Sequence, residues 1–119
     1  MEHLKLYIGG KWVDGHSGAV IEVENPATKE IIATVPRGDK IDVEAAVNAA
    51  KEGFNVWKNY TGVQRGACLR KAAEYFKKNS KKIADIITAE LGAPISMAED
   101  WHVGGAYGET IEFAEFAEQ

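Results

Sequence analysis

The sequence predicts an α/β fold in which antiparallel strands come first and three or four amphipathic helices follow. Two observations predict it: β-branched residues gather in short runs before residue 37, and beyond residue 39 apolar side chains recur at intervals of three and four. We find no internal repeat and no linker rich in Pro, Gly or Ser. Residues 1–119 are therefore expected to belong to a single domain.

The strand region begins with an expected hairpin. Apolar residues alternate over 4–8, as in a strand, and Gly9-Gly10 can adopt the positive φ of a tight turn. Residues 11–13 are then expected to form the second, antiparallel strand. After a turn-like segment, the β-branched runs 20–23 and 31–35 predict two further strands.

The first helix is expected to begin at Asp39, whose side chain can cap the free backbone N–H groups of a helix N-terminus. Its apolar residues recur at the spacing of one buried face. That predicted face consists of Val43, Ala46, Val47, Ala50, Phe54 and Trp57.

A second helix is expected to open with the capping box Thr61 to Gln64. Its apolar stripe skips at Asn79-Ser80, which predicts two helices or a kink, and Gly92 and Pro94 supply stop signals. The stripe consists of Leu69, Ala72, Ala73, Phe76, Ile83, Ile86, Ile87 and Leu91.

A third helix is expected to open with a second capping box, Ser96 to Glu99. Its middle carries Gly104, Gly105 and Gly108, for which close helix packing or a small-residue gap is the simplest reason. No stop signal follows, so the last element is expected to be incomplete.

Composition and charge limit the partners. A net charge of −4 and a pI near 5.4 argue against nucleic acid and against an anionic membrane surface, which both require a concentrated basic face. Two series of like charges are interpreted as solvated helix faces: the lysines at 77, 78, 81 and 82 and the glutamates at 109, 112, 115 and 118. With one cysteine, no signal peptide and no apolar run of membrane-spanning length, we expect a cytoplasmic protein.

The residues that could carry chemistry have simpler structural interpretations. Cys68 lies inside a predicted helix and is expected to be a buried structural thiol. The three histidines lack the spacing of a metal site. The glycines at 104, 105 and 108 do not follow a strand, as a phosphate-binding loop would require. We therefore expect no catalytic residue in this chain and no cofactor bound by it.

The order of elements carries a family resemblance. Tyr7–Val13, the Asn-Pro turn within Val23–Thr28, the strand Ile31–Pro36 and the acidic-Leu-Gly-x-Pro turn Glu90–Pro94 stand in an order that resembles the start of an aldehyde dehydrogenase. The resemblance implies an incomplete domain, the outer part of a Rossmann-like cofactor domain. It also implies that the nucleophilic cysteine, the general-base glutamate and the dinucleotide-contacting loops lie beyond residue 119.

The resemblance further implies what the full-length parent does. A cysteine thiolate adds to an aldehyde, hydride passes to NAD or NADP, and water hydrolyses the thioester to a carboxylic acid. The parent is expected to be a homo-oligomer. These residues leave four questions open. They do not indicate which aldehyde the parent oxidises, which of the two nucleotides it uses, how many subunits it has or why the chain is short.

Two sites are carried over by the resemblance alone. Some members of the family hold a monovalent cation with a carboxylate that matches Glu90 and with carbonyls that match Val23 and Glu24. The third helix lines a substrate tunnel in the family, which puts Trp101 and Gly105 on its wall. The alternatives are an exposed glutamate at a helix end, a tryptophan in the core and a glycine that allows close packing.

One alternative belongs to another functional class. The apolar stripes of the second and third helices could bind a partner helix, which would make the chain a non-enzymatic helical interaction module. The strands and the Asn-Pro turn argue against this function, because a helical adaptor has no need of them. Under the enzymatic interpretation the same stripes await a sheet supplied by other residues, and the isolated chain is expected to self-associate.

Overall fold

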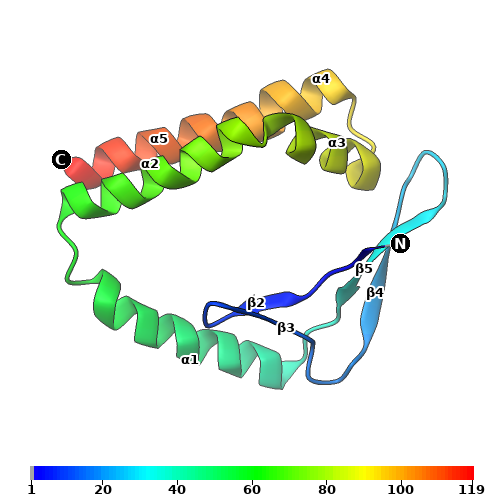
Figure 1. Ribbon diagram of the computed structural model, residues 1–119, viewed down its shortest axis with the longest axis horizontal. Coiled ribbons are helices and arrows are strands. Elements are labelled where there is room, and N and C mark those ends of the chain that lie inside the picture. The colour runs from blue at the N-terminus through cyan, green and yellow to red at the C-terminus, as the bar shows by residue number, and fades with distance from the viewer. Residues whose placement is uncertain (1) are drawn as a thin grey trace. The chain divides into compact units, whose positions relative to one another are not determined.

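The computed structural model describes residues 2–119 and is a mixed α/β structure, as expected. It divides into two compact units, Met1–Lys58 and Asn59–Gln119, which are described separately below. The first unit contains β1 (Glu2–His3), β2 (Leu6–Ile8), β3 (Lys11–Val13), β4 (Val20–Glu24), β5 (Ile31–Pro36) and α1 (Lys40–Trp57). The second contains α2 (Gly62–Lys78), α3 (Ser80–Leu91), α4 (Ile95–Met97), the π-helix η1 (Ala98–Val103) and α5 (Gly104–Glu118) (Figure 1).

The strands of the first unit form two small sheets. The expected hairpin is confirmed, with β2 antiparallel to β3 and positive φ values of 59° and 79° at Gly9 and Gly10. β4 and β5 are antiparallel, also as expected. β1 adds to β5 in the parallel direction, a pairing that the alternation of residues did not indicate, and His3 Nδ1 lies 2.7 Å from Thr34 Oγ1 across it.

The N-terminus of α1 is fixed by two carboxylates. Asp39 caps the helix as predicted, since its side chain accepts hydrogen bonds from the backbone N–H groups of Ile41 and Asp42. Asp42, only 8% exposed, accepts from the backbone of Asp39 at 2.9 Å and from that of His16 at 3.0 Å. The loop after β3 is thereby held against the start of α1.

The predicted buried face of α1 is exposed, so that prediction is wrong for this chain. Val43, Val47 and Phe54 all lie open, with Phe54 60% exposed. The periodicity correctly identified an amphipathic helix, but burial also needs an element opposite the face, and the other elements of the first unit leave this face uncovered.

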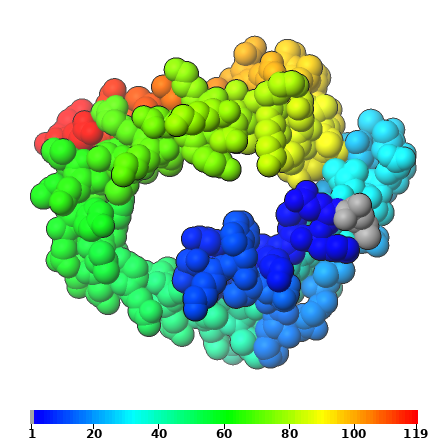
Figure 2. Space-filling model, in the orientation of Figure 1, coloured from blue at the N-terminus to red at the C-terminus, as the bar shows by residue number. Residues whose placement is uncertain are grey.

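Helices α2 and α5 pack along each other in the second unit, and Figure 2 shows their atoms, green for α2 and orange to red for α5, in contact. Thr61 and Gln64 form the predicted capping box. Ala73 and Ala114 are fully buried. A β-carbon on Gly62 would overlap the carbonyl oxygen of Ala117, so the two backbones approach more closely than any other residue would permit.

The predicted interruption at Asn79 is confirmed, because this residue ends α2 and precedes α3. Gly92 ends α3 with a left-handed φ of 78°, as its stop signal indicated. Of the apolar stripe, Ala73 is buried and Phe76, Ile83 and Ile87 are half-buried, whereas Ala72, Ile86 and Leu91 are exposed.

The third helix begins differently from the expectation. Pro94 occupies the cap position of α4, without a side-chain cap, and Ser96 already lies within the helix. The capping-box prediction at Ser96 is therefore wrong, because proline fixes the backbone two residues earlier. The helix then continues through the π segment η1 into α5. Among residues 2–119, no helix is long and apolar enough to cross a membrane.

Candidate functional site

Trp101 and Gly105, the two residues expected on a substrate tunnel, lie at the π-helix η1 and the start of α5. Trp101 is 76% exposed, so its interpretation as a core residue is wrong for this chain. A β-carbon on Gly105 would meet nothing within 4 Å, and the same is true of Gly108. Close packing is therefore not the reason for either glycine among the described residues, which leaves a small-residue gap as the other expected reason.

The backbone around Trp101 departs from α-helical geometry. The N–H of Gly104 donates to the carbonyl of Glu99, five residues earlier, and also to that of Trp101. Ala98 and Val103 of η1 are buried against Ala84 of α3, with Ile83 and Ile87 packed around them. One side of η1 thus carries a small apolar core while Trp101 lies exposed. The prediction that Trp101 and Gly105 share a face stays a prediction, since it assumed α-helical spacing throughout.

The three residues of the expected cation site are divided between the units. Glu90 is an exposed residue at the end of α3, in the second unit. Val23 and Glu24 belong to β4, where the register with β5 shifts, and Glu24 pairs with Lys29 at 3.0 Å. Among the residues that the structure describes, no group of three or more His, Cys, Asp or Glu side chains could hold a metal ion. The site stays a prediction.

Cys68 is exposed, and the expectation of a buried thiol is wrong. The buried positions of α2 are Gly66 and Ala73, two residues before and five residues after it. On an α-helix neither spacing brings residues to the same face, so Cys68 points away from the α2–α5 interface. Among the described residues, no basic side chain forms a hydrogen bond with the Cys68 sulfur.

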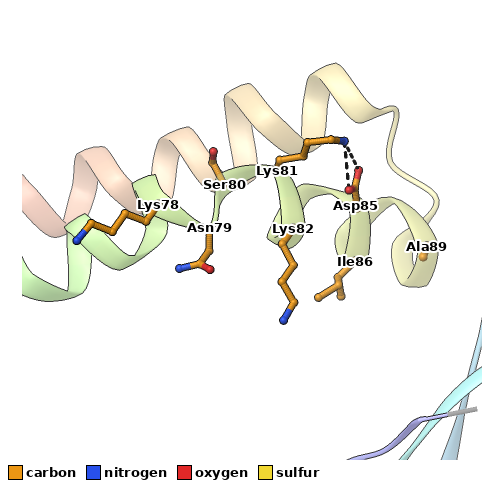
Figure 3. Close-up of a pocket in the computed structure, with 8 residues that line it drawn as sticks. All are labelled: Lys78, Asn79, Ser80, Lys81, Lys82, Asp85, Ile86 and Ala89. Carbon is orange, nitrogen blue, oxygen red and sulfur yellow. Dashed lines mark hydrogen bonds and ion pairs between the residues drawn. The ribbon is translucent and has the colours of Figure 1, made fainter.

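A shallow depression of about 650 Å³ lies where α2 passes into α3. Figure 3 shows Asn79, Lys82 and Ile86 on one side of the helix, while Lys81 turns back to pair with Asp85 at 3.3 Å. The lysines are exposed, and an i to i+4 ion pair is a common feature of a solvated helix surface. The depression therefore has the character of a charged surface. Its lining is Lys78, Asn79, Ser80, Lys81, Lys82, Asp85, Ile86 and Ala89.

Two hydrogen-bonded pairs lower the pKa values of their carboxyl groups. The hydrogen bond from His16, with Nδ1 2.9 Å from Oδ2, lowers the pKa of Asp39 below its usual 3.8. Arg70 donates two hydrogen bonds, at 3.2 and 2.9 Å, to Glu118. These bonds lower the pKa of Glu118 and raise the pKa of Arg70. Both pairs fasten one element to another within a unit.

Two glycines of α2 that no sequence motif singled out let α5 approach this helix closely. A β-carbon on Gly66 would overlap the carboxylate of Glu118, as one on Gly62 would overlap Ala117. Two glycines four residues apart lie on the same side of a helix, so the spacing of 62 and 66 was the available signal. These contacts hold the helix that continues into η1 and Trp101.

Together, the strands, the capped helices and the π-interrupted helix define an α/β segment, and comparisons with known proteins identify the family to which it belongs. The family model described as "Aldehyde dehydrogenase family" matches residues 12–119. A protein of Staphylococcus aureus strain USA300 named "Putative aldehyde dehydrogenase" is 40% identical over 101 residues, which are 85% of this chain and 21% of that protein.

Solved structures agree with the sequence match. Aldehyde dehydrogenase from Bartonella henselae superimposes with a TM-score of 0.93 at 30% identity, covering 99% of this chain and 25% of that one. PnpE in complex with nicotinamide adenine dinucleotide gives 0.93 at 29% identity, covering 97% and 24%. The Staphylococcus aureus betaine aldehyde dehydrogenase P449M mutant with NAD+ gives 0.91 at 27% identity, covering 97% and 24%.

The chain therefore belongs to the aldehyde dehydrogenase family. It spans about a fifth of the curated relatives that it matches, 21% of their length. Its fold corresponds to the N-terminal, cofactor-binding region of the solved relatives.

Proposed function

We propose that this chain is the N-terminal part of an NAD(P)-dependent aldehyde dehydrogenase that oxidises an aldehyde to a carboxylic acid. The observation that carries the proposal is the match of residues 12–119 to the family, together with TM-scores of 0.91 and 0.93 to two enzymes solved with the dinucleotide. The small-molecule substrate is an aldehyde, and the electrons leave it as a hydride to the nicotinamide.

By itself the chain is proposed to be catalytically silent. Aldehyde oxidation by this route needs an activated nucleophile, a placed base and donors for the nucleotide phosphates. The single cysteine, Cys68, is exposed on α2, and no phosphate-binding glycine loop follows a strand in the sequence. We propose that the segment acts as a scaffold for groups supplied by residues outside it, and that the assembled enzyme is a cytoplasmic homo-oligomer.

Within that enzyme we propose that Trp101 and Gly105 form part of the substrate-tunnel wall. The exposure of Trp101, 76%, and the open space around a β-carbon at Gly105 support this role, because a wall residue must present its surface to a ligand. An indole beside a missing side chain suits a bulky or aromatic aldehyde.

A cation site formed by the Glu90 carboxylate and the carbonyls of Val23 and Glu24 is also proposed. Oxygen ligands suit a hard monovalent ion. Glu90 lies exposed, so its carboxylate is accessible to an ion.

The decisive experiment is a chimera in which this chain replaces the matching N-terminal fifth of the Staphylococcus aureus relative. We expect the chimera to reduce NAD or NADP with an aldehyde, while the relative without any N-terminal segment, and this chain alone, do not. A folded chimera that binds nucleotide but turns over no aldehyde would contradict the proposal, as would NAD(P)H formation by the isolated chain.

A further inference from the structure

Two buried residues of η1 are spaced in a way that an α-helix cannot accommodate. Ala98 and Val103 both pack against Ala84 of α3, with exposed fractions of 0% and 4%. They are five residues apart. At about 100° per residue, an α-helix would turn them about 140° away from each other, so that only one could face α3.

The π-helix resolves the mismatch. Its backbone bonds join residues five apart, which brings Ala98 and Val103 to the same side, and the bond from the N–H of Gly104 to the carbonyl of Glu99 has this pattern. In effect the helix contains one residue more than an α-helix would need between the two packing positions.

The packing itself does not require that extra residue. With one residue removed between them, Ala98 and Val103 would stand four apart in an ordinary α-helix, on one face and in contact with the same core. What the extra residue does change is the direction of the side chains opposite the core. The largest of these is Trp101, 76% exposed.

We infer that the π turn determines substrate specificity. Its extra residue sets the direction in which the Trp101 side chain points, so the length of the segment between Ala98 and Val103 determines which aldehydes the enzyme accepts. This inference rests on the proposed role of Trp101 in the tunnel wall. Trp101 is the residue that meets substrate, and the turn is what positions it. π turns occur frequently at functional sites, in keeping with this role.

Two deletions in the isolated chain test whether the extra residue sets the direction of the Trp101 side chain. Removing Asp100 or His102, both exposed, restores α-helical spacing between Ala98 and Val103. The deletions leave the tryptophan two or three residues after Ala98, respectively, two places about 100° apart around the helix. The matched controls are Asp100→Ala and His102→Ala, which remove the same side chains and keep the length.

With Trp12→Phe and Trp57→Phe in the background, Trp101 is the single tryptophan, and its fluorescence is excited selectively at wavelengths that tyrosine does not absorb. We expect both deletion variants to keep the parent's helicity by circular dichroism. Acrylamide quenching of Trp101 should fall when His102 is deleted, because the indole turns toward the flank of α3, and should stay high when Asp100 is deleted. Loss of helicity in both deletions would overturn the inference, because the extra residue would then be needed for packing.

The effect on substrate specificity is measured in the chimera as the ratio of KM for benzaldehyde to KM for acetaldehyde. We expect each deletion to change this ratio by about tenfold or more, as misfit in a shaped pocket does, and the length-preserving controls to leave it near the parent value. Trp101→Ala separates the two claims. If this variant changes the ratio and the deletions do not, the inference is overturned and the tunnel role stands. If Trp101→Ala has no effect, the tunnel role itself is wrong and the inference falls with it.

Discussion

Replacing Gly62 by alanine should destabilise the second unit, because α5 occupies the space that the new methyl group would need. A β-carbon there would overlap the carbonyl oxygen of Ala117 and lie 3.1 Å from its carbonyl carbon and 3.6 Å from the Cα of Glu118. These are backbone atoms, so no side chain can swing aside. Helix α5 itself must move away from α2.

The magnitude follows from two opposing terms. Forcing an extra methyl group into a packed contact typically costs about 1–3 kcal/mol. Alanine gains up to about 1 kcal/mol over glycine in a helix interior, but Gly62 is the first residue of α2, where this gain is smaller. We therefore expect a net loss of about 1–3 kcal/mol. For a unit of this size that corresponds to a fall in Tm of about 5–20 °C.

Two other glycines provide matched controls in the same unit. At Gly108, inside α5, a β-carbon meets nothing within 4 Å, so alanine should raise stability by about 0.5–1 kcal/mol through helix propensity alone. At Gly66 the clash is with the flexible side chain of Glu118, which can rotate away from Arg70, so the Tm should stay closer to the parent's. The assay is thermal unfolding followed by circular dichroism at 222 nm. A Gly62→Ala variant that melts at or above the parent temperature would refute the close approach of α5 to α2.

Three further predictions concern pH, association and activity. The pKa of Asp39 is lowered in the fold, so its stabilising contribution is present above its usual 3.8 and is lost as the pH falls through the lowered value. The Tm of the parent should therefore drop between about pH 5 and pH 2, and Asp39→Asn, which keeps a capping side chain, should lessen this drop; equal slopes would contradict the assigned cause. The exposed apolar face of α1 should drive self-association, seen as a dimer or larger species by light scattering, and Phe54→Asp should reduce it relative to the control Lys51→Asp; a monomeric parent at high concentration would count against this. Finally, the isolated chain should form no NAD(P)H from a panel of aldehydes, and turnover that requires the pure chain would contradict the proposed function.

The features that the sequence determined are those set by neighbours along the chain. Gly9-Gly10 fixed the hairpin because few residues other than glycine accept positive φ there. Asp39 and Thr61 fixed two helix starts because a capping side chain reaches only the next turn of backbone. The interruption at Asn79 and the end at Gly92 followed from equally local signals. The order of these elements was sufficient to identify the family.

What the tertiary structure alone decided depends on which element lies opposite. The apolar face of α1 has the periodicity of a buried surface, yet Phe54 is exposed, because burial is a property of two surfaces and only one is in its own sequence. The importance of Gly62 appears only when α5 is laid beside it. The π turn is the clearest case: Ala98 and Val103 both find space against Ala84, and this contact outweighs the local preference for α-helical spacing. The exposure of Trp101, and with it the candidate substrate site, is a consequence of that long-range packing.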